Sequence, residues 1–329
     1  MTVISEGDKL LEVSSLCTYF YVSGKVAKAV DDVSFSLGQG ETLGLVGESG
    51  CGKTVAARSI IRLIPNPPGK IVGGKIIYGN TDLLNLPEKD MLKVRGKQIS
   101  MIFQEPMTSL NPVFAMGDQV GEVIRLHNDL SKREVRNKVI EMFYKVGIPD
   151  AERRIRDYPH QMSGGMRQRG MIAMALACNP RLILADEPTT ALDVTIQAQI
   201  LDLMNKLKEE TNASILFITH NMGVIAEMSK NVAVMYAGKL MEYGNVKSIF
   251  AQPLHPYVVG LMKSIPVIGR RPGGNRLYTI RGVVPSLLDV PSGCLFNDRC
   301  PEAFKECKVV EPSLVSVDKN HTVRCLKYA

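Results

Sequence analysis

The sequence has no hydrophobic run long enough to cross a membrane. A spanning helix needs roughly 18 or more consecutive apolar residues, and the longest candidate, residues 171–178, stops at Asn179-Pro180. Residues 1–8 are polar and lack the apolar segment of a secretory signal. We therefore expect the protein in the cytosol, or as a peripheral protein on the cytoplasmic face of the cell membrane.

Internal repeats, low-complexity segments and runs of like charge are also lacking. The 329 residues carry a net charge of +7, but the basic residues are scattered and never form a run of five. This distribution indicates a solvated surface with a mild basic bias rather than a stripe that binds nucleic acid or anionic lipid. A hydrophobic content of 45% supports a packed core and argues against disorder.

The periodicity of apolar residues divides the first 250 residues into three parts. Residues 10 to about 105 alternate strand signals with glycine and proline turns. Residues 106 to about 165 have helical spacing, with a capping box at 131–134. Residues 166–240 alternate helices with short apolar strands, and this pattern predicts an α/β fold with a mostly parallel sheet covered by helices.

After about residue 250 the composition changes. Eight of the 18 prolines lie in the last 79 residues, at positions 253, 256, 266, 272, 285, 291, 301 and 312. We expect a nucleotide-binding domain over residues 1–250 and a small, loop-rich C-terminal domain over residues 251–329.

One segment fits G-x-x-x-x-G-K-[ST], the pattern of a phosphate-binding loop. An apolar strand signal at 42–46 precedes it and a helical pattern at 54–64 follows it, a context that a glycine-rich turn with a chance lysine does not explain. Lys53 is expected to reach the β- and γ-phosphates of a nucleotide, and Thr54 to hold Mg²⁺. The predicted ATP-binding residues of this loop are Gly47, Glu48, Ser49, Gly50, Cys51, Gly52, Lys53 and Thr54.

Two adjacent acids end the apolar run 182–185. Carboxylates at the carboxyl end of a strand in a parallel sheet lie at the edge where ligands of open α/β folds bind. We expect Asp186 to hold Mg²⁺ through water and Glu187 to orient or deprotonate the attacking water. An isolated Asp-Glu pair would be a solvated loop, but the phosphate-binding loop makes the hydrolytic interpretation the better one.

The segment Ser163-Gly164-Gly165, which precedes a helical pattern, decides between classes of nucleotide-binding protein. With it the sequence resembles the ATP-binding-cassette (ABC) ATPases. That resemblance implies a P-loop fold with a RecA-like parallel sheet core, an antiparallel β-subdomain and an α-helical subdomain at about 106–165. It also implies that these three residues face the ATP bound by the opposite subunit of a dimer, with a helix N-terminus directed at the γ-phosphate.

Other marks of the family follow in the expected order. Gln104 is similar to the glutamine that contacts Mg²⁺ and water, and His220 to the histidine that clamps the γ-phosphate. Ala191-Leu192-Asp193 resembles the loop, with its aspartate, through which the subunits of the dimer communicate. Phe20, or Tyr19 next to it, matches the aromatic residue that stacks on adenine; the alternative is a core aromatic on a strand.

The segment 104–112 and the tail narrow the resemblance to the ATPases of dipeptide and oligopeptide importers. The tail marks are His255-Pro256-Tyr257, Ser264-Ile265-Pro266, Gly293-Cys294, Arg299-Cys300 and Val323-Arg324-Cys325. The resemblance implies two integral-membrane permease subunits as partners, a sister ATPase or a second copy in the dimer, and an extracytoplasmic substrate-binding protein. The same branch includes importers of oligosaccharides and nickel.

Four of the seven cysteines, Cys294, Cys300, Cys307 and Cys325, follow the spacing C-x5-C-x6-C-x17-C. The cytosol disfavours disulfides, and a small module with little core is suited to a metal staple. Zinc usually brings tight C-x2-4-C pairs, which are lacking, although zinc and ordinary structural cysteines stay open. Some dipeptide-importer ATPases carry a [4Fe–4S] cluster at such a motif, and the resemblance therefore implies an iron–sulfur cluster with a structural role.

Three functions follow from these patterns. The first is the ATP-hydrolysing subunit of a membrane importer. The second is a soluble cassette ATPase that acts on nucleic acid or ribosomes, although that class usually carries two cassettes on one chain. The third is a nucleotide-binding regulator without turnover, against which Glu187 and His220 argue. We favour the importer, with ATP and Mg²⁺ as ligands and peptide cargo implied by the resemblance.

Overall fold

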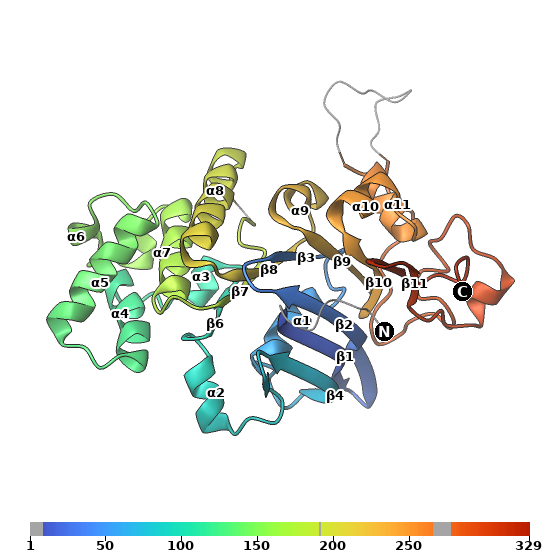
Figure 1. Ribbon diagram of the computed structural model, residues 1–329, viewed down its shortest axis with the longest axis horizontal. Coiled ribbons are helices and arrows are strands. Elements are labelled where there is room, and N and C mark those ends of the chain that lie inside the picture. The colour runs from blue at the N-terminus through green and yellow to red at the C-terminus, as the bar shows by residue number, and fades with distance from the viewer. Residues whose placement is uncertain (1–8, 191, 266–277) are drawn as a thin grey trace. The chain divides into compact units, whose positions relative to one another are not determined.

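Figure 1 shows the computed structural model, which describes residues 9–190, 192–265 and 278–329. Contacts divide it into two compact units. The first comprises residues up to Gly38, Thr42–Leu84 and all residues from Thr219 on, and the second comprises Gln39–Glu41 and Asn85–Ile218. Ala191, Pro266 and Pro272, which belong to patterns discussed above, lie outside the described residues.

The first unit contains an antiparallel sheet in the strand order β2-β1-β4-β5. Its strands are β1 (Lys9–Val22), β2 (Lys25–Gly38), β4 (Gly69–Tyr78) and β5 (Thr81–Asp82). Val33, Phe35 and Leu37, which alternate along β2, are all buried, as expected for the core-facing side of a strand. This sheet is the antiparallel element that the resemblance implied.

Five further strands of this unit lie in the order β11-β12-β10-β9-β3. They are β3 (Thr42–Val46), β9 (Asn231–Tyr236), β10 (Lys239–Asn245), β11 (Val315–Asp318) and β12 (His321–Val323). Only β3 and β9 are parallel, whereas β9, β10, β12 and β11 pair antiparallel. The parallel sheet predicted from the alternation is therefore a mixed sheet here, because a tight turn joins β9 directly to β10.

Short helices complete this unit: α1 (Lys53–Ile60), α9 (Met222–Met228), α10 (Val246–Ala251), α11 (Pro256–Lys263) and a 3₁₀ turn (Lys305–Lys308). Helix α1 ends earlier than the predicted 54–64. Arg62 adopts a left-handed φ of 54°, and Leu63 N–H donates to the carbonyl of Arg58 at 2.8 Å. This is a Schellman stop, which sequence periodicity does not reveal without a glycine.

The second unit has a core of three parallel strands, β6 (Ile99–Ile102), β7 (Leu182–Asp186) and β8 (Ser214–Thr219). Thr219, the last residue of β8, belongs to the first unit. Figure 1 shows its helices α4, α5 and α7 packed together. The helices are α2 (Glu88–Val94), α3 (Pro106–Ser109), α4 (Met116–His127), α5 (Lys132–Lys145), α6 (Ala151–Arg154), a 3₁₀ turn (Pro159–Gln161), α7 (Gly164–Leu176) and α8 (Val194–Thr211).

Helix α5 forms where the capping box predicts it. The Ser131 hydroxyl accepts from Glu134 N–H at 3.3 Å, and Ser131 N–H donates to the Glu134 carboxylate at 2.8 Å. Val135, Val139 and Met142 are buried, as their helical spacing predicts. The helix stops before Gly147, which has the left-handed φ of 72° that a C-terminal glycine provides.

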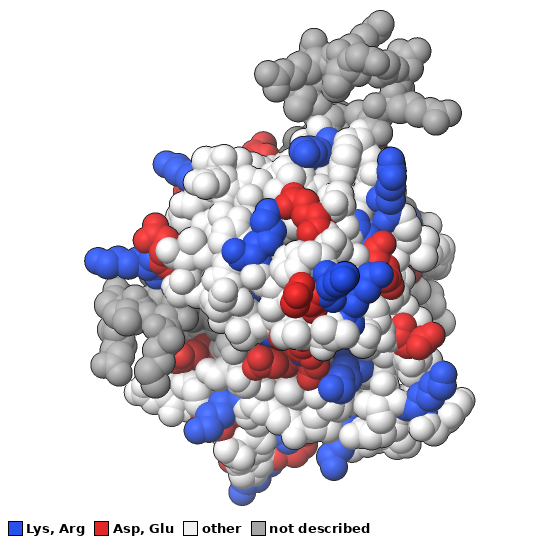
Figure 2. All heavy atoms as spheres, turned by 90° about the vertical axis from the view of Figure 1, so that its right-hand side faces the viewer, with Lys and Arg blue, Asp and Glu red and all other residues white. Residues whose placement is uncertain are grey.

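The C-terminal region is rich in turns, as its prolines predict, but it also extends the sheet of the first unit. β12 pairs with β10 from Glu242↔Val323 to Gly244↔His321. On the face shown in Figure 2, acidic and basic side chains are interspersed, so the net charge creates no continuous basic field there. None of the helices in the described ranges is long and apolar enough to span a membrane.

A buried carboxylate ties this region to β10. The Glu242 carboxylate is fully buried. It accepts hydrogen bonds from Leu254 N–H at 3.0 Å and from His255 N–H at 2.7 Å, and it lies 2.7 Å from His321 Nε2. Charge-assisted hydrogen bonds of this kind satisfy donors that would otherwise be buried without partners.

Substitution Glu242→Ala should therefore destabilise the fold by about 2–4 kcal/mol, because it leaves two backbone N–H groups and a histidine without their acceptor. Exposed Glu227 on α9 provides the matched control, Glu227→Ala, with an effect near zero. Chemical unfolding monitored by circular dichroism compares the two variants. Equal unfolding midpoints would show that Glu242 does not stabilise the fold.

Candidate functional site

The phosphate-binding loop joins β3 to α1 in the first unit, as predicted. Its shape depends on glycine at two positions. A Cβ on Gly52, which has a φ of 104°, would lie 2.0 Å from the carbonyl oxygen of Ala29. A Cβ on Gly47 would lie 2.2 Å from that of Met235. Any other residue would clash with backbone at both positions, so the loop runs closer to β2 and β9 than a side chain allows.

Lys53 is the first residue of α1 and is almost completely buried. Its Nζ donates to the carbonyl oxygens of Gly47 at 2.8 Å and Glu48 at 3.0 Å, so the ammonium lies inside the curve of the loop. No acidic residue occurs in the first turn of α1, and its positive end is therefore not neutralised locally. Thr54 follows in that first turn, where a hydroxyl next to bound phosphates could reach a magnesium ion.

Cys51 of this loop behaves as a small core residue. Its side chain is fully buried, and burial raises the pKa of its thiol. Its carbonyl accepts from Gly238 N–H at 3.0 Å, which ties the loop to the turn between β9 and β10. The thiol is therefore neutral and fills space in the core.

The two candidate adenine-binding residues differ in their surroundings. The Tyr19 hydroxyl donates to the Asp31 carboxylate at 2.6 Å, and burial together with that hydrogen bond raises the pKa of Tyr19. Phe20 pairs with Gly69 of β4 across the antiparallel sheet, and a Cβ on Gly69 would lie 2.8 Å from its ring. The Tyr19 side chain is thus held by its hydrogen bond to Asp31, whereas the half-buried Phe20 side chain has no group that needs a hydrogen-bond partner.

In the second unit the structure brings Gln104 and Glu187 together. Asp186 is the last residue of β7 and is fully buried, and Glu187 follows with a left-handed φ of 45°. Gln104 Nε2 donates to Glu187 Oε2 at 3.2 Å, and the Thr190 hydroxyl donates to the same oxygen at 2.8 Å. A non-glycine residue with such a φ directly after a buried strand is typical of functional sites, where strain orients a side chain.

Thr190 is a contact that the sequence analysis missed. It lies three residues after Glu187, and its N–H also donates to the Glu187 carbonyl at 3.1 Å in a turn. A hydroxyl three residues after an acid at a strand end is the signal that could have identified it.

Ser163 caps helix α7 in the second unit. Its hydroxyl accepts from Met166 N–H at 3.3 Å, and Gly164 and Gly165 form the first helical turn, which contains no acidic residue. A Cβ added to Gly165 would lie 3.1 Å from the Ile196 side chain, and one added to Gly164 would lie 3.9 Å from the Leu192 side chain. The turn therefore presents backbone N–H groups and little side chain, which suits an anion.

Asp193 and His220 are the remaining predicted residues. The Asp193 carboxylate caps α8 by accepting from Ile196 N–H at 2.9 Å. His220 is exposed and directly follows β8. The next residue, Asn221, caps α9. Lys53, Thr54 and His220 belong to the first unit, and Gln104, Ser163, Asp186, Glu187 and Asp193 belong to the second.

The four tail cysteines line one small pocket of the first unit, with a volume of about 20 Å³. His255, Phe296 and Phe304 line it as well. Burial raises the pKa of Cys294 to about 11 and also raises the pKa of Cys300 and of Cys325. Among the described residues, no three His, Cys, Asp or Glu side chains are arranged to hold a single metal ion.

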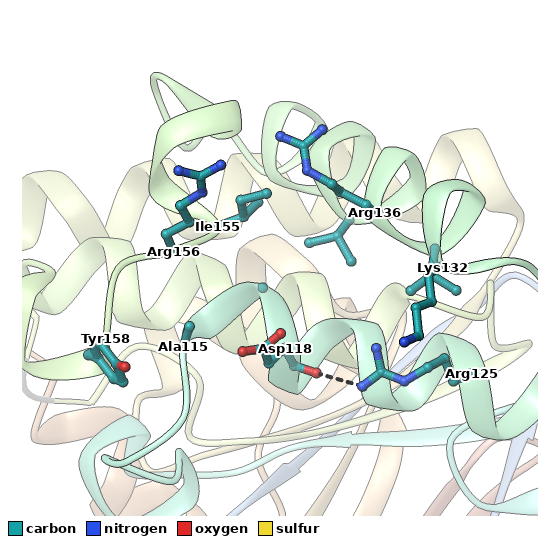
Figure 3. Close-up of a pocket in the computed structure, with 11 residues that line it drawn as sticks. Ala115, Asp118, Arg125, Lys132, Arg136, Ile155, Arg156 and Tyr158 are labelled. Atoms are coloured by element: carbon teal, nitrogen blue, oxygen red, sulfur yellow. Dashed lines mark hydrogen bonds between the residues drawn. The ribbon is translucent and has the colours of Figure 1, made fainter.

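A second, larger pocket lies in the second unit between α4, α5 and the segment after α6 (Figure 3), with a volume of about 590 Å³. Figure 3 shows basic side chains around it, with Arg125 donating to the Asp118 carbonyl at 3.4 Å. This pocket is not evident from the sequence, because its basic residues come from three separate segments: Arg125, Lys132, Arg136 and Arg156.

Two protein families match this chain. Residues 30–190 match the family described as ABC transporter, and residues 241–307 match the family described as oligopeptide/dipeptide transporter, C-terminal region. The chain is 49% identical over 319 residues to the oligopeptide transport ATP-binding protein AppD of Bacillus subtilis, with 97% of each chain covered. It is 48% identical over 318 residues to the dipeptide transport ATP-binding protein DppD of the same organism, covering 97% of this chain and 94% of that one.

Among solved structures, the ATP-binding cassette MJ0796, a dimer in a post-hydrolysis state with ADP and Pi, is similar with a TM-score of 0.65 at 26% identity. The match covers 72% of this chain and 98% of that one. The phosphate-binding loop, the two acids at the end of β7 and the Ser-Gly-Gly turn are the parts expected of such a cassette. The chain therefore belongs to the ABC transporter ATPases, as an ATP-binding subunit of the peptide, oligopeptide and dipeptide importer family.

Proposed function

We propose that this subunit hydrolyses ATP to power the import of dipeptides or oligopeptides. The observation that carries the proposal is the Glu187 carboxylate, which Gln104 and Thr190 hold at the end of a fully buried strand. In this proposal Glu187 orients or deprotonates the attacking water. Lys53 binds the β- and γ-phosphates.

The other predicted residues complete the chemistry in this scheme. Thr54, Asp186 and Gln104 hold Mg²⁺, directly or through water. His220 contacts the γ-phosphate, and Phe20 stacks on adenine. Phe20 is preferred over Tyr19 because Tyr19 already donates to Asp31. Backbone N–H groups of residues 47–54 surround the phosphate chain.

We further propose that the complete site needs two ATPase chains, either a sister subunit or a second copy. The first turn of α7, with Ser163, Gly164 and Gly165, would bind the ATP held by the other chain, and Asp193 would transmit its presence. The small side chains and the positive helix end support this, as does the relative MJ0796, whose solved form is described as a dimer.

Substitution Glu187→Gln should abolish turnover but leave ATP binding intact, because it removes the base while conserving the shape of the side chain. We expect kcat to fall by about 10²-fold or more, in the range of a lost general base, and an ATP-bound dimer to accumulate in size-exclusion chromatography. Glu209→Gln on the exposed end of α8 is the matched control. A normal hydrolysis rate in Glu187→Gln would refute the assignment of the base.

The basic pocket of Figure 3 is the surface that we propose for the permeases. It lies in the helical region that, in the importers this chain resembles, receives a short helix of the membrane subunit. Three of its basic residues, Lys132, Arg136 and Arg156, surround a cavity that could admit such a helix carrying acidic side chains. This docking would place the protein on the cytoplasmic face of the membrane.

Reversing the charge with Arg136→Glu should weaken co-purification with the permease subunits by about tenfold, as expected for a lost interfacial charge pair. Arg133→Glu, on an exposed position of the same helix outside the pocket, should not. ATP binding by the free subunit should be unchanged in both variants. If both variants co-purify with the permeases as well as the wild type, the pocket is not the docking surface.

We propose that Cys294, Cys300, Cys307 and Cys325 hold a [4Fe–4S] cluster that stabilises the C-terminal region. The four thiols line one pocket, and four cysteine thiolates are the usual ligands of a [4Fe–4S] cluster. Binding would also require the thiols, whose pKa burial raises, to release their protons.

Anaerobically purified protein should show the broad visible absorbance of an iron–sulfur cluster and about four irons per chain. The double variant Cys300→Ala/Cys307→Ala should lose both and unfold at a lower temperature, while Cys178→Ala, outside the pocket, should retain them. A colourless wild-type protein with stoichiometric zinc would contradict the cluster.

The cargo is assigned from the family alone, because an ATPase subunit of an importer is not expected to bind the cargo itself. Oligosaccharide or nickel import by the same machinery is the second candidate. A cassette ATPase acting on nucleic acid is disfavoured by the C-terminal match, and the face shown in Figure 2 carries interspersed charges rather than a basic patch.

A further inference from the structure

The phosphate-binding loop makes an unexpected set of contacts at Glu48. Its N–H donates to the Tyr257 hydroxyl at 3.0 Å, and its carboxylate accepts from Arg299 Nη1 at 3.0 and 3.2 Å. Its carbonyl accepts from Lys53 Nζ at 3.0 Å. One residue therefore joins the lysine that is to bind phosphate to two side chains from the last quarter of the chain.

Arg299 is itself held in place on several sides. Only 7% of its side chain is exposed, and its Nε donates to the Arg281 carbonyl at 2.9 Å. Its Nη1 also donates to the Tyr236 hydroxyl at 3.3 Å, and its guanidinium lies 5.6 Å from the Tyr236 ring and 5.8 Å from the Phe296 ring. A partly buried ion pair with fixed geometry constrains its partner more than an exposed pair does.

Tyr257 is equally immobile. It is fully buried on α11 and packs against Tyr236 with a centroid distance of 4.8 Å and against Phe296 at 5.4 Å. Burial raises the pKa of Tyr257, so its hydroxyl stays neutral. Tyr236, Tyr257 and Phe296 form an aromatic cluster on which both contacts to Glu48 rest.

We infer that Arg299 and Tyr257 are positioning residues that hold the phosphate-binding loop in the conformation that binds ATP. Neither touches the phosphates in this scheme. They fix Glu48, whose carbonyl in turn helps to place the Lys53 ammonium. The inference rests on the proposed function, since it concerns ATP binding by this loop.

The same segment lines the cysteine pocket. Phe296 and Cys300 both border that pocket, and Arg299 lies between them in the chain. The C-terminal region therefore contacts the phosphate-binding loop at a residue that lies between two residues of the cysteine pocket. Because coupling between sites is reciprocal, whatever shifts this segment should change the affinity for ATP, and ATP should stabilise the segment.

The test measures ATP affinity on the full chain with Mg²⁺ by isothermal titration calorimetry, in the variants Arg299→Gln, Glu48→Gln and their combination. We expect each single variant to raise the Kd for ATP about five- to twentyfold, a loss typical of a charged hydrogen bond. The double variant should bind no more weakly than the weaker-binding single variant, because the two residues act through one contact. Tyr257→Phe should raise the Kd about two- to fivefold.

Two further variants separate positioning from mere stabilisation. Arg299→Lys, which keeps the positive charge but not the fixed guanidinium contacts, should bind ATP more tightly than Arg299→Gln and more weakly than the wild type. Arg281→Gln removes an exposed arginine from the same region and should bind ATP as the wild type does. Thermal unfolding of each variant verifies that it is folded.

Unchanged ATP affinity in a folded Arg299→Gln protein, or fully additive losses in the double variant, would overturn the inference. A wild-type protein that binds no ATP would instead overturn the proposed function, and the inference with it. The two failures are distinguishable, because only the second is seen in the unsubstituted chain.

Discussion

The close approach of backbone to backbone at Gly47 and Gly52 is the constraint on which the nucleotide site depends. At both positions a Cβ would overlap a carbonyl oxygen, from Met235 on β9 and from Ala29 on β2. This closeness forms the curve in which the Lys53 ammonium lies, at the start of α1. The consequence is a loop whose shape is set by neighbouring strands and not by its own residues alone.

A second set of constraints orients the acids of the other unit. Strand β7 buries all five of its residues, so Asp186 and Glu187 emerge at a fixed point of the parallel core. Gln104 and Thr190 then converge on one oxygen of Glu187. Hydrogen bonds that hold a carboxylate before its substrate arrives reduce the reorganisation needed during the reaction.

The C-terminal region is integrated into the first unit by contacts of several kinds. β12 extends the sheet, Glu242 anchors the backbone around His255, and Arg299 reaches the phosphate-binding loop. A segment that sequence composition describes as a loop-rich appendage therefore shares its stability with the nucleotide site. This arrangement explains why its aromatic residues Tyr257 and Phe296 are fully buried despite the many prolines around them.

The sequence by itself determined the chemistry and the local structure. The loop at 47–54, the two acids at the end of the strand β7 and the capping box of α5 were all recognisable, because each depends on residues close together in the chain. Tertiary structure alone decided which distant residues meet. Glu48 and Arg299 are 251 positions apart, and the four cysteines share a pocket through turns that have no periodicity. The early stop of α1 at a left-handed arginine and the antiparallel strands beside β9 were likewise invisible, because they arise from packing and turn geometry that local patterns do not encode.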